Sequence, residues 1–176
     1  IKKILILASG SILGGFLGGT LLKYVDESFI DKAYIFMLIL VLLSVVYRNK
    51  IPKINIKNPF LQFFTGIITG GLSGFFGIGG GPFQVSTLII FFGLDIKEAS
   101  VDSIFITFLT TISSLFKYTL NGYADFSLAV YMIPAAILGG LIGSRLNRKI
   151  SEKKIALIFI SSVIFIILVQ TYIVIT

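Results

Sequence analysis

The sequence contains no cysteine and no histidine. It therefore offers no thiolate nucleophile, no imidazole base and none of the common zinc or haem ligand sets. Charged residues are also scarce, at 13% of the chain, whereas an ordinary soluble domain has about a quarter. These shortages argue against a thiol- or metal-dependent enzyme and against a soluble fold.

Hydrophobic residues, in contrast, make up 56% of the chain, and the mean hydropathy is +1.00. They gather in long runs, most of which have roughly the 17–25 residues that cross a bilayer as a helix. A shorter run, Phe83–Leu94, reaches only part-way across a membrane. We therefore predict an all-α, multi-pass bundle in the cell membrane. The long runs are Ile4–Leu22, Ala33–Tyr47, Phe60–Gly77, Val101–Leu120, Leu128–Ser144 and Ile155–Val174.

The net charge of +7 is concentrated in short loops, which indicates membrane orientation rather than nucleic-acid binding. Residues 48–58 and 145–154 are rich in Lys and Arg, whereas 121–127 has neither and 23–32 balances two Lys with three acids. The positive-inside rule places the two basic loops in the cytoplasm and the other two outside. This topology requires residues 60–94 to enter and leave the membrane on one side, as a hairpin.

Glycines interrupt that hairpin at residues 74–82, Gly-Phe-Phe-Gly-Ile-Gly-Gly-Gly-Pro. So many glycines break a helix, and at membrane depth the freed backbone groups need protein, water or a ligand as partners. A new helix starting at Pro82 would direct N–H groups and a positive dipole end at the break. Such an arrangement suits an anion, although a purely structural turn is the alternative.

The chain also contains an internal repeat. Residues 11–22 match 136–147 at a constant offset of 125, with Gly14, Gly15 and Gly18 falling on Gly139, Gly140 and Gly143. Glycine pairs four residues apart are common in packed membrane helices, but the shared order and the helix–loop–helix that follows favour duplication.

We therefore predict two inverted repeats with glycine-broken, re-entrant helices, a plan known from secondary transporters. Residues 1–58 form the end of the first repeat, and residues 59–176 form the second. The spacing predicts another glycine break about 47 residues before Ile1, so we expect the chain to be the C-terminal part of a longer protein.

Two further patterns concern the helices around the break. Gly66, Gly70 and Gly74 recur every four residues and predict a close-packed face. Hydroxyl residues also follow one face of the next helix, and they favour either a polar path or hydrogen bonds within and between helices. These hydroxyl residues are Ser103, Thr107, Thr110, Thr111 and Ser114.

The predicted binding site combines the glycine break with nearby polar side chains, and we expect no catalytic residue, metal or cofactor in it. The backbone at 79–81 is expected to contact an anion directly, with Gln84 and Ser86 as hydrogen-bond donors. The complete set comprises Gly77, Gly79, Gly80, Gly81, Gln84, Ser86, Thr87, Ser103 and Thr107.

The segment Gly66–Leu88 and the glycine-rich Ile137–Leu146 resemble the TauE/SafE family of membrane transporters, also called the toluene-sulfonate uptake permease family. The resemblance continues through the terminal helix. It implies a duplicated membrane protein that moves small anions such as sulfite, sulfoacetate or other organosulfur compounds. Ser86 stands where the family often has proline, and residues 100–103, Ser-Val-Asp-Ser, replace its usual run of small residues.

The sequence thus predicts a secondary transporter whose partners are a small anion and the lipid bilayer, not nucleic acid. A membrane-embedded enzyme is disfavoured by the missing His and Cys residues. A passive channel or a structural membrane subunit is the other alternative, and a homo-oligomer stays open.

Overall fold

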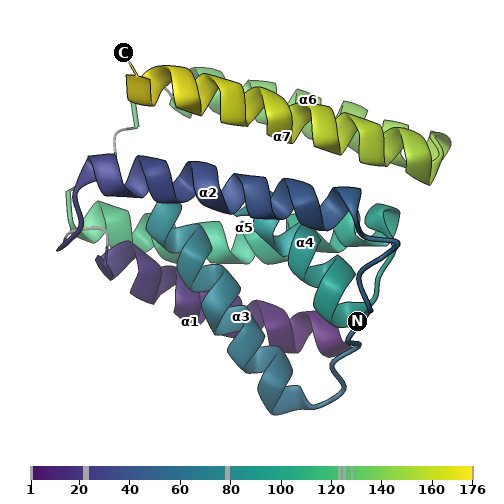
Figure 1. Ribbon diagram of the computed structural model, residues 1–176. Helices are drawn as coiled ribbons and strands as arrows, with labels where there is room; N and C mark the ends of the chain where they lie inside the picture. Colours follow the sequence, from purple (N-terminus) through teal and green to yellow (C-terminus); the bar gives the residue numbers. More distant parts are fainter. Residues whose placement is uncertain are drawn as a thin grey trace.

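A computed structural model describes residues 2–21, 24–77, 80–122, 124, 126–127 and 129–175. Within these residues the chain forms seven α-helices (Figure 1). Six are long and apolar enough to cross a membrane, and the short α4 is not. The predicted all-helical, multi-pass architecture is confirmed at this level. The helices are α1 (Lys2–Leu21), α2 (Glu27–Val46), α3 (Pro59–Phe76), α4 (Gly81–Phe92), α5 (Ile96–Leu120), α6 (Ala129–Lys149) and α7 (Glu152–Ile175).

Capping residues explain where two of the helices begin. The Asn58 side chain accepts a hydrogen bond from the Phe60 N–H group, which starts α3 at Pro59. The Asp95 carboxylate accepts bonds from the N–H groups of Lys97 and Glu98, both at 2.8 Å. Because of this cap, α5 begins five residues before the apolar run at Val101.

The outer surface of the bundle is apolar. Phe36, Phe165 and Leu168 are each more than 60% exposed, and they lie among many other large exposed apolar side chains. A soluble protein rarely presents so much contiguous apolar surface. This surface is suited to lipid tails.

The tightest helix contact joins α1 to α3 through glycines on both helices. A Cβ atom added to Gly66, Gly70 or Gly74 of α3 would collide with backbone carbonyl oxygens of α1. Glycine therefore lets these two backbones touch, as in other small-residue membrane interfaces. The prediction of a close-packed glycine face is confirmed.

Helices α3 and α4 form a hairpin whose outer ends meet. The N–H groups of Ile54 and Ile56, just before α3, donate to the carbonyl oxygens of Ile90 and Phe91 at the end of α4. The lengths of these bonds are 3.0 Å and 2.8 Å. The end of the hairpin thus returns to the loop from which it started.

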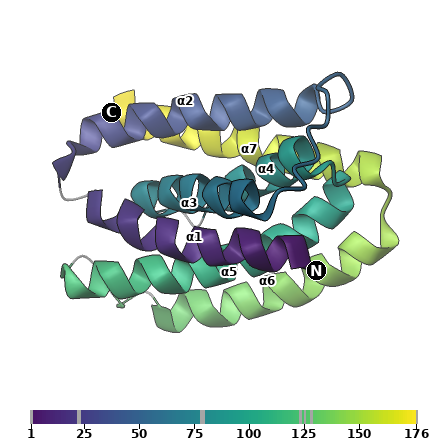
Figure 2. The same ribbon diagram turned by 90° about the horizontal axis from the view of Figure 1, so that it is seen from below.

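Further hydrogen bonds bring both basic loops, residues 48–58 and 145–154, close to the end of this hairpin. The Lys53 ammonium group bonds to the Gly93 carbonyl oxygen, and the Lys97 ammonium group bonds to the carbonyl oxygen of Ile150. Residues 47–58 and 149–152 therefore lie at the same end of the bundle. Figure 2 shows α1 and α6 running in opposite directions between its two ends.

Helix α4 lies in the centre of the bundle and α6 at its margin. Residues 83–89 of α4 are all buried, and the main hydrophobic core combines α4 with residues of α1, α2, α5 and α7. None of the described α6 residues is buried. The core thus positions the start of α4, where the glycine break lies.

Candidate functional site

The glycine break has the backbone geometry that its sequence predicts. Gly77 ends α3 with a φ of 69°, and Gly80 caps α4 with a φ of 59°. Both values lie in the left-handed region that side-chain-bearing residues avoid. The new helix begins at Gly81, one residue before the predicted Pro82. Gly79, also predicted for the site, lies outside the described residues.

An aromatic cluster holds the two sides of the break together. Phe76, the last residue of α3, stacks on Phe83 of α4 with ring centroids 5.8 Å apart. Tyr34 of α2 packs against Phe76 at 5.5 Å and against Phe83 at 6.4 Å. Offset and tilted contacts of this kind are favourable for aromatic rings. These contacts therefore fix the end of α3 and the start of α4 relative to each other.

A cavity of about 350 Å³, here called the helix-start cavity, opens beside the first residue of α4. It lies between Gly81 and side chains of Ser, Thr, Ile and Phe residues of α5. The Thr107 hydroxyl oxygen is buried and has no hydrogen-bond partner among the described residues. A buried hydroxyl without a partner is costly, so a rotation of the Thr107 side chain that brought its hydroxyl to a ligand or water in the cavity would be stabilising. The lining residues are Gly81, Ser103, Ile104, Thr107, Phe108 and Thr111.

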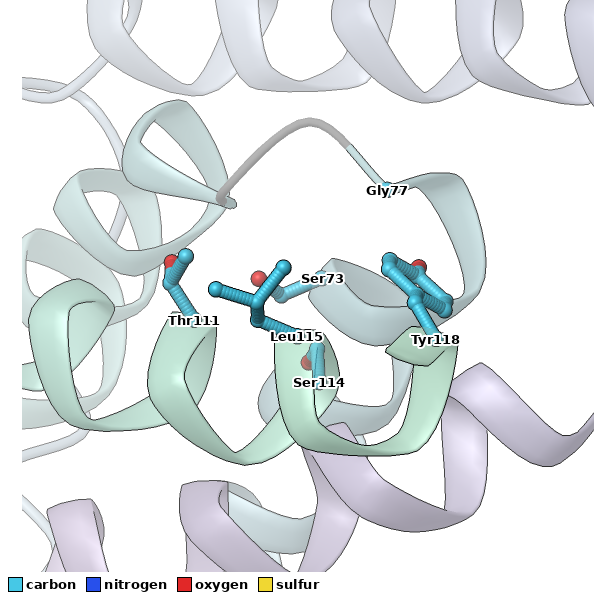
Figure 3. Close-up of a pocket in the computed structure, with 6 residues that line it drawn as sticks. All are labelled: Ser73, Gly77, Thr111, Ser114, Leu115 and Tyr118. Carbon is cyan, nitrogen blue, oxygen red and sulfur yellow. The ribbon is translucent and has the colours of Figure 1, made fainter. Parts of the chain in front are cut away.

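A second cavity of about 120 Å³, here called the tyrosine cavity, lies at the other end of the break (Figure 3). Ser73 reaches it from α3, and Thr111 and Tyr118 reach it from α5. The Tyr118 hydroxyl donates a hydrogen bond to the Gly74 carbonyl oxygen. Thr111 lines both cavities, so the two lie next to each other along α5. The lining residues are Ser73, Gly77, Thr111, Ser114, Leu115 and Tyr118.

The electrostatics of this region come from the backbone rather than from charged side chains. The Gln84 N–H group bonds to the Gly80 carbonyl oxygen, 3.0 Å away, as the first hydrogen bond of α4. The N–H groups of Gly81 and Phe83 precede that bond, where helix N–H groups lack partners within the helix. They add to the positive dipole end of α4. No group of His, Cys, Asp or Glu among the described residues could hold a metal ion.

The structure separates the predicted site residues into two groups. Gly81, Ser103 and Thr107 line the helix-start cavity, and Gly77 lines the tyrosine cavity, while Gly80 caps the helix between them.

The remaining side chains, Gln84, Ser86 and Thr87, are buried and line neither cavity. The Gln84 amide nitrogen donates to Ser11 of α1 at 3.4 Å, and its amide oxygen has no partner among the described residues. The Ser86 hydroxyl accepts a bond from Ser44 of α2 at 2.8 Å. These contacts join α4 to its neighbours.

The hydroxyl stripe of α5 also divides. Ser103, Thr110 and Ser114 each bond to a carbonyl oxygen of their own helix, as hydroxyls in membrane helices commonly do. Thr110 is buried against Gly15 of α1, away from the helix-start cavity. Thr107 and Thr111 instead belong to the cavity face.

Sequence reasoning left Thr111, Ser73 and Tyr118 out of the predicted site. A usable signal existed for each of them. Thr111 and Tyr118 are seven residues apart, which places them on one face of α5, and Ser73 lies one helical turn before Gly77.

The six candidate spans, the apolar outer surface and the cavities beside a broken helix define a multi-pass membrane protein. The sequence model of the family described as "Sulfite exporter TauE/SafE" matches residues 1–169. The chain therefore belongs to the TauE/SafE family, as the resemblance predicts.

Curated relatives are named as probable membrane transporters. The chain is 28% identical to probable membrane transporter protein YunE of Bacillus subtilis, over 89% of this chain and 65% of that protein. It is 30% identical to probable membrane transporter protein MJ0441 of Methanocaldococcus jannaschii, over 85% of this chain and 59% of that protein. The chain thus spans about three-fifths of the length of these relatives. No solved structure matches.

Proposed function

We propose that this chain is the larger part of a secondary transporter for small anions, with sulfite and small sulfonates as the substrate class. The observation that carries the proposal is the helix-start cavity, where the first residue of α4 and its positive dipole end lie beside Ser103, Thr107 and Thr111 of α5. Backbone N–H groups and neutral hydroxyls are suited to an anion that enters without a counterion.

With two inverted repeats, this cavity would lie at the central site around which the repeats move during transport. The opposite directions of α1 and α6 and the hairpin of α3 and α4 both support this plan. In such transporters a broken helix in each repeat contributes to one central site, and the repeats rock around it. Residues 1–58 then complete the first repeat, and 59–176 form the second.

Thr107→Val in the complete transporter tests the proposed site. Valine keeps the shape of threonine and removes a hydroxyl that has no partner among the described residues. We expect stability to stay the same or rise. The affinity for sulfite should fall roughly ten- to a hundred-fold, because a hydrogen bond to a charged group is worth about 1.5–3 kcal/mol.

Thr110→Val is the matched control on the same helix. Its hydroxyl bonds to the Ile106 carbonyl oxygen and lines neither cavity, so sulfite affinity should stay unchanged. The measurement is sulfite uptake into liposomes that contain each purified variant. If Thr107→Val binds sulfite with the affinity of the wild type, the helix-start cavity is not part of the binding site.

A passive channel is the second candidate, because none of the described residues that line the two cavities carries a charge that could couple transport to another ion. Counterflow separates the two functions. Liposomes preloaded with unlabelled sulfite should transiently accumulate labelled sulfite if the protein is a carrier. A channel would only equilibrate the label.

A further inference from the structure

Helix α6 presents an uncovered glycine face. A Cβ atom added to Gly139, Gly140 or Gly143 would meet nothing within 4 Å in the part of the chain that the structure describes. No described residue of α6 is buried, although the helix is 21 residues long and apolar enough to cross a membrane.

The same motif in α1 is fully covered. Gly14 and Gly18, which correspond to Gly139 and Gly143, lie so close to α3 that an added Cβ atom would collide with the carbonyl oxygens of Ile67 and Gly71. The partner helix α3 carries its own glycines at four-residue spacing. The contact of α1 with α3 therefore shows that the repeated glycine motif packs against a helix with small residues at four-residue spacing.

A hollow of about 490 Å³ lies beside the open face of α6. Gly143 lines it on the α6 side, Pro82 and Ile104 line it on the side of α4 and α5, and Phe159 and Val163 line it on the side of α7. Ile104 is 69% exposed and also lines the helix-start cavity. A segment in this hollow would thus contact both the glycine face and the start of α4.

The length of the relatives indicates that such a segment exists, and the spacing of the predicted repeats places it before residue 1. The chain covers 59–65% of the two relatives described above, so about two-fifths of their length has no counterpart here. We propose that the glycine face of α6 binds a membrane helix from the part of the transporter that precedes residue 1. That helix has small residues at four-residue spacing and packs on α6 as α3 packs on α1.

This proposal rests on the two-repeat plan of the proposed function, but its test does not use transport. Gly143→Leu and Gly139→Leu are introduced into the full-length transporter, and thermal unfolding of each purified protein is followed. An open α6 face predicts equal or higher stability, because leucine is a better helix former than glycine. A covered face predicts a melting temperature lower by roughly 5 °C or more, because the added side chain separates the helices.

Two variants calibrate this measurement. Gly14→Leu disrupts the observed contact of α1 with α3 and gives the size of a true clash. Leu141→Phe adds volume on the opposite face of α6, where Leu141 is 53% exposed, and should change little. If Gly143→Leu behaves like Leu141→Phe rather than like Gly14→Leu, the face is open and the proposal is wrong.

Cross-linking identifies the helix that covers the face. A single cysteine replaces Ala136, on the same face of α6, and is labelled with a benzophenone maleimide in membranes. After illumination, mass spectrometry should find the adduct in the segment that precedes residue 1. Adducts only within residues 1–176 of a second copy, or only with lipid, would overturn the proposal. If Gly143→Leu and Gly139→Leu do not lower the melting temperature, this packing is wrong. If they do lower it but the wild-type transporter takes up no sulfite, only the proposed function is wrong.

Discussion

The glycines of the break should differ widely in their tolerance of alanine, although they lie within five residues of one another. Gly80 has a φ of 59°, a conformation that costs alanine about 1–2 kcal/mol. An added Cβ atom there would also collide with the Ser73 side chain and lie 3.2 Å from the Ser73 Cα atom. Relieving such an overlap costs typically about 1–3 kcal/mol. We therefore expect Gly80→Ala to lower the free energy of unfolding by about 2–5 kcal/mol.

The two neighbours provide graded controls. Gly77 shares the left-handed backbone, but an added Cβ atom would only make ordinary contact with the Tyr118 hydroxyl oxygen at 3.4 Å. Gly77→Ala should therefore cost only the backbone term, about 1–2 kcal/mol. Gly81 begins α4 without a positive φ and has open space around it. Gly81→Ala should raise the free energy of unfolding by about 0.4–1 kcal/mol through the unfolded state.

Equilibrium unfolding of the complete protein in mixed micelles, titrated with a denaturing detergent, would measure these differences. From the most to the least stable, we expect the order Gly81→Ala, wild type, Gly77→Ala and Gly80→Ala. If Gly80→Ala were as stable as Gly81→Ala, the backbone described here for the break would be wrong. The packing of Gly80 against Ser73 would then carry no energetic weight.

Two other predictions concern the helix cap and the orientation of the chain. Asp95→Ala removes two hydrogen bonds to the first turn of α5 and should destabilise the protein by about 0.5–2 kcal/mol. Asp95→Asn should cost much less, since asparagine also caps helices well. If chemical denaturation shows equal losses of stability for the two variants, the cap is not the cause. Single cysteines at Asn55 and Asn147 should resist an impermeant maleimide on intact cells, whereas Asn121→Cys should react, because positive charge favours the cytoplasmic side. Labelling of Asn147→Cys without Asn121→Cys would invert the topology.

Much of the fold could be predicted from the sequence because membrane helices carry their signal in long apolar runs. The glycine face of α3 and the break after Phe76 could also be predicted, since glycine at such spacing has few other uses. Helix ends were less predictable. α5 begins at Ile96 because Asp95 caps it, and α6 continues five residues beyond Ser144 to Lys149.

The cavity lining was harder to predict because it depends on which helices become neighbours. Thr107 and Thr110 are both hydroxyl residues of α5, yet one faces a cavity and the other faces Gly15. The burial of Gln84 against Ser11 likewise joins residues that are 73 positions apart in the sequence. Periodicity identifies the polar face of a helix, but only the tertiary arrangement shows what that face contacts.

The shortness of α4 has a consequence for how the protein is made. With 12 residues α4 is only about 18 Å long, so it cannot cross the hydrocarbon of a bilayer alone. It also carries Gln84, Ser86 and Thr87, whose polar groups are costly to leave in lipid. α4 therefore enters the membrane together with α3, and its polar groups are buried only after α1, α2 and α5 have gathered around it. Biogenesis of this protein thus depends on α1 and α2, which are made before α4, and on α5, which is made after it, because α4 is not stable in the bilayer without them.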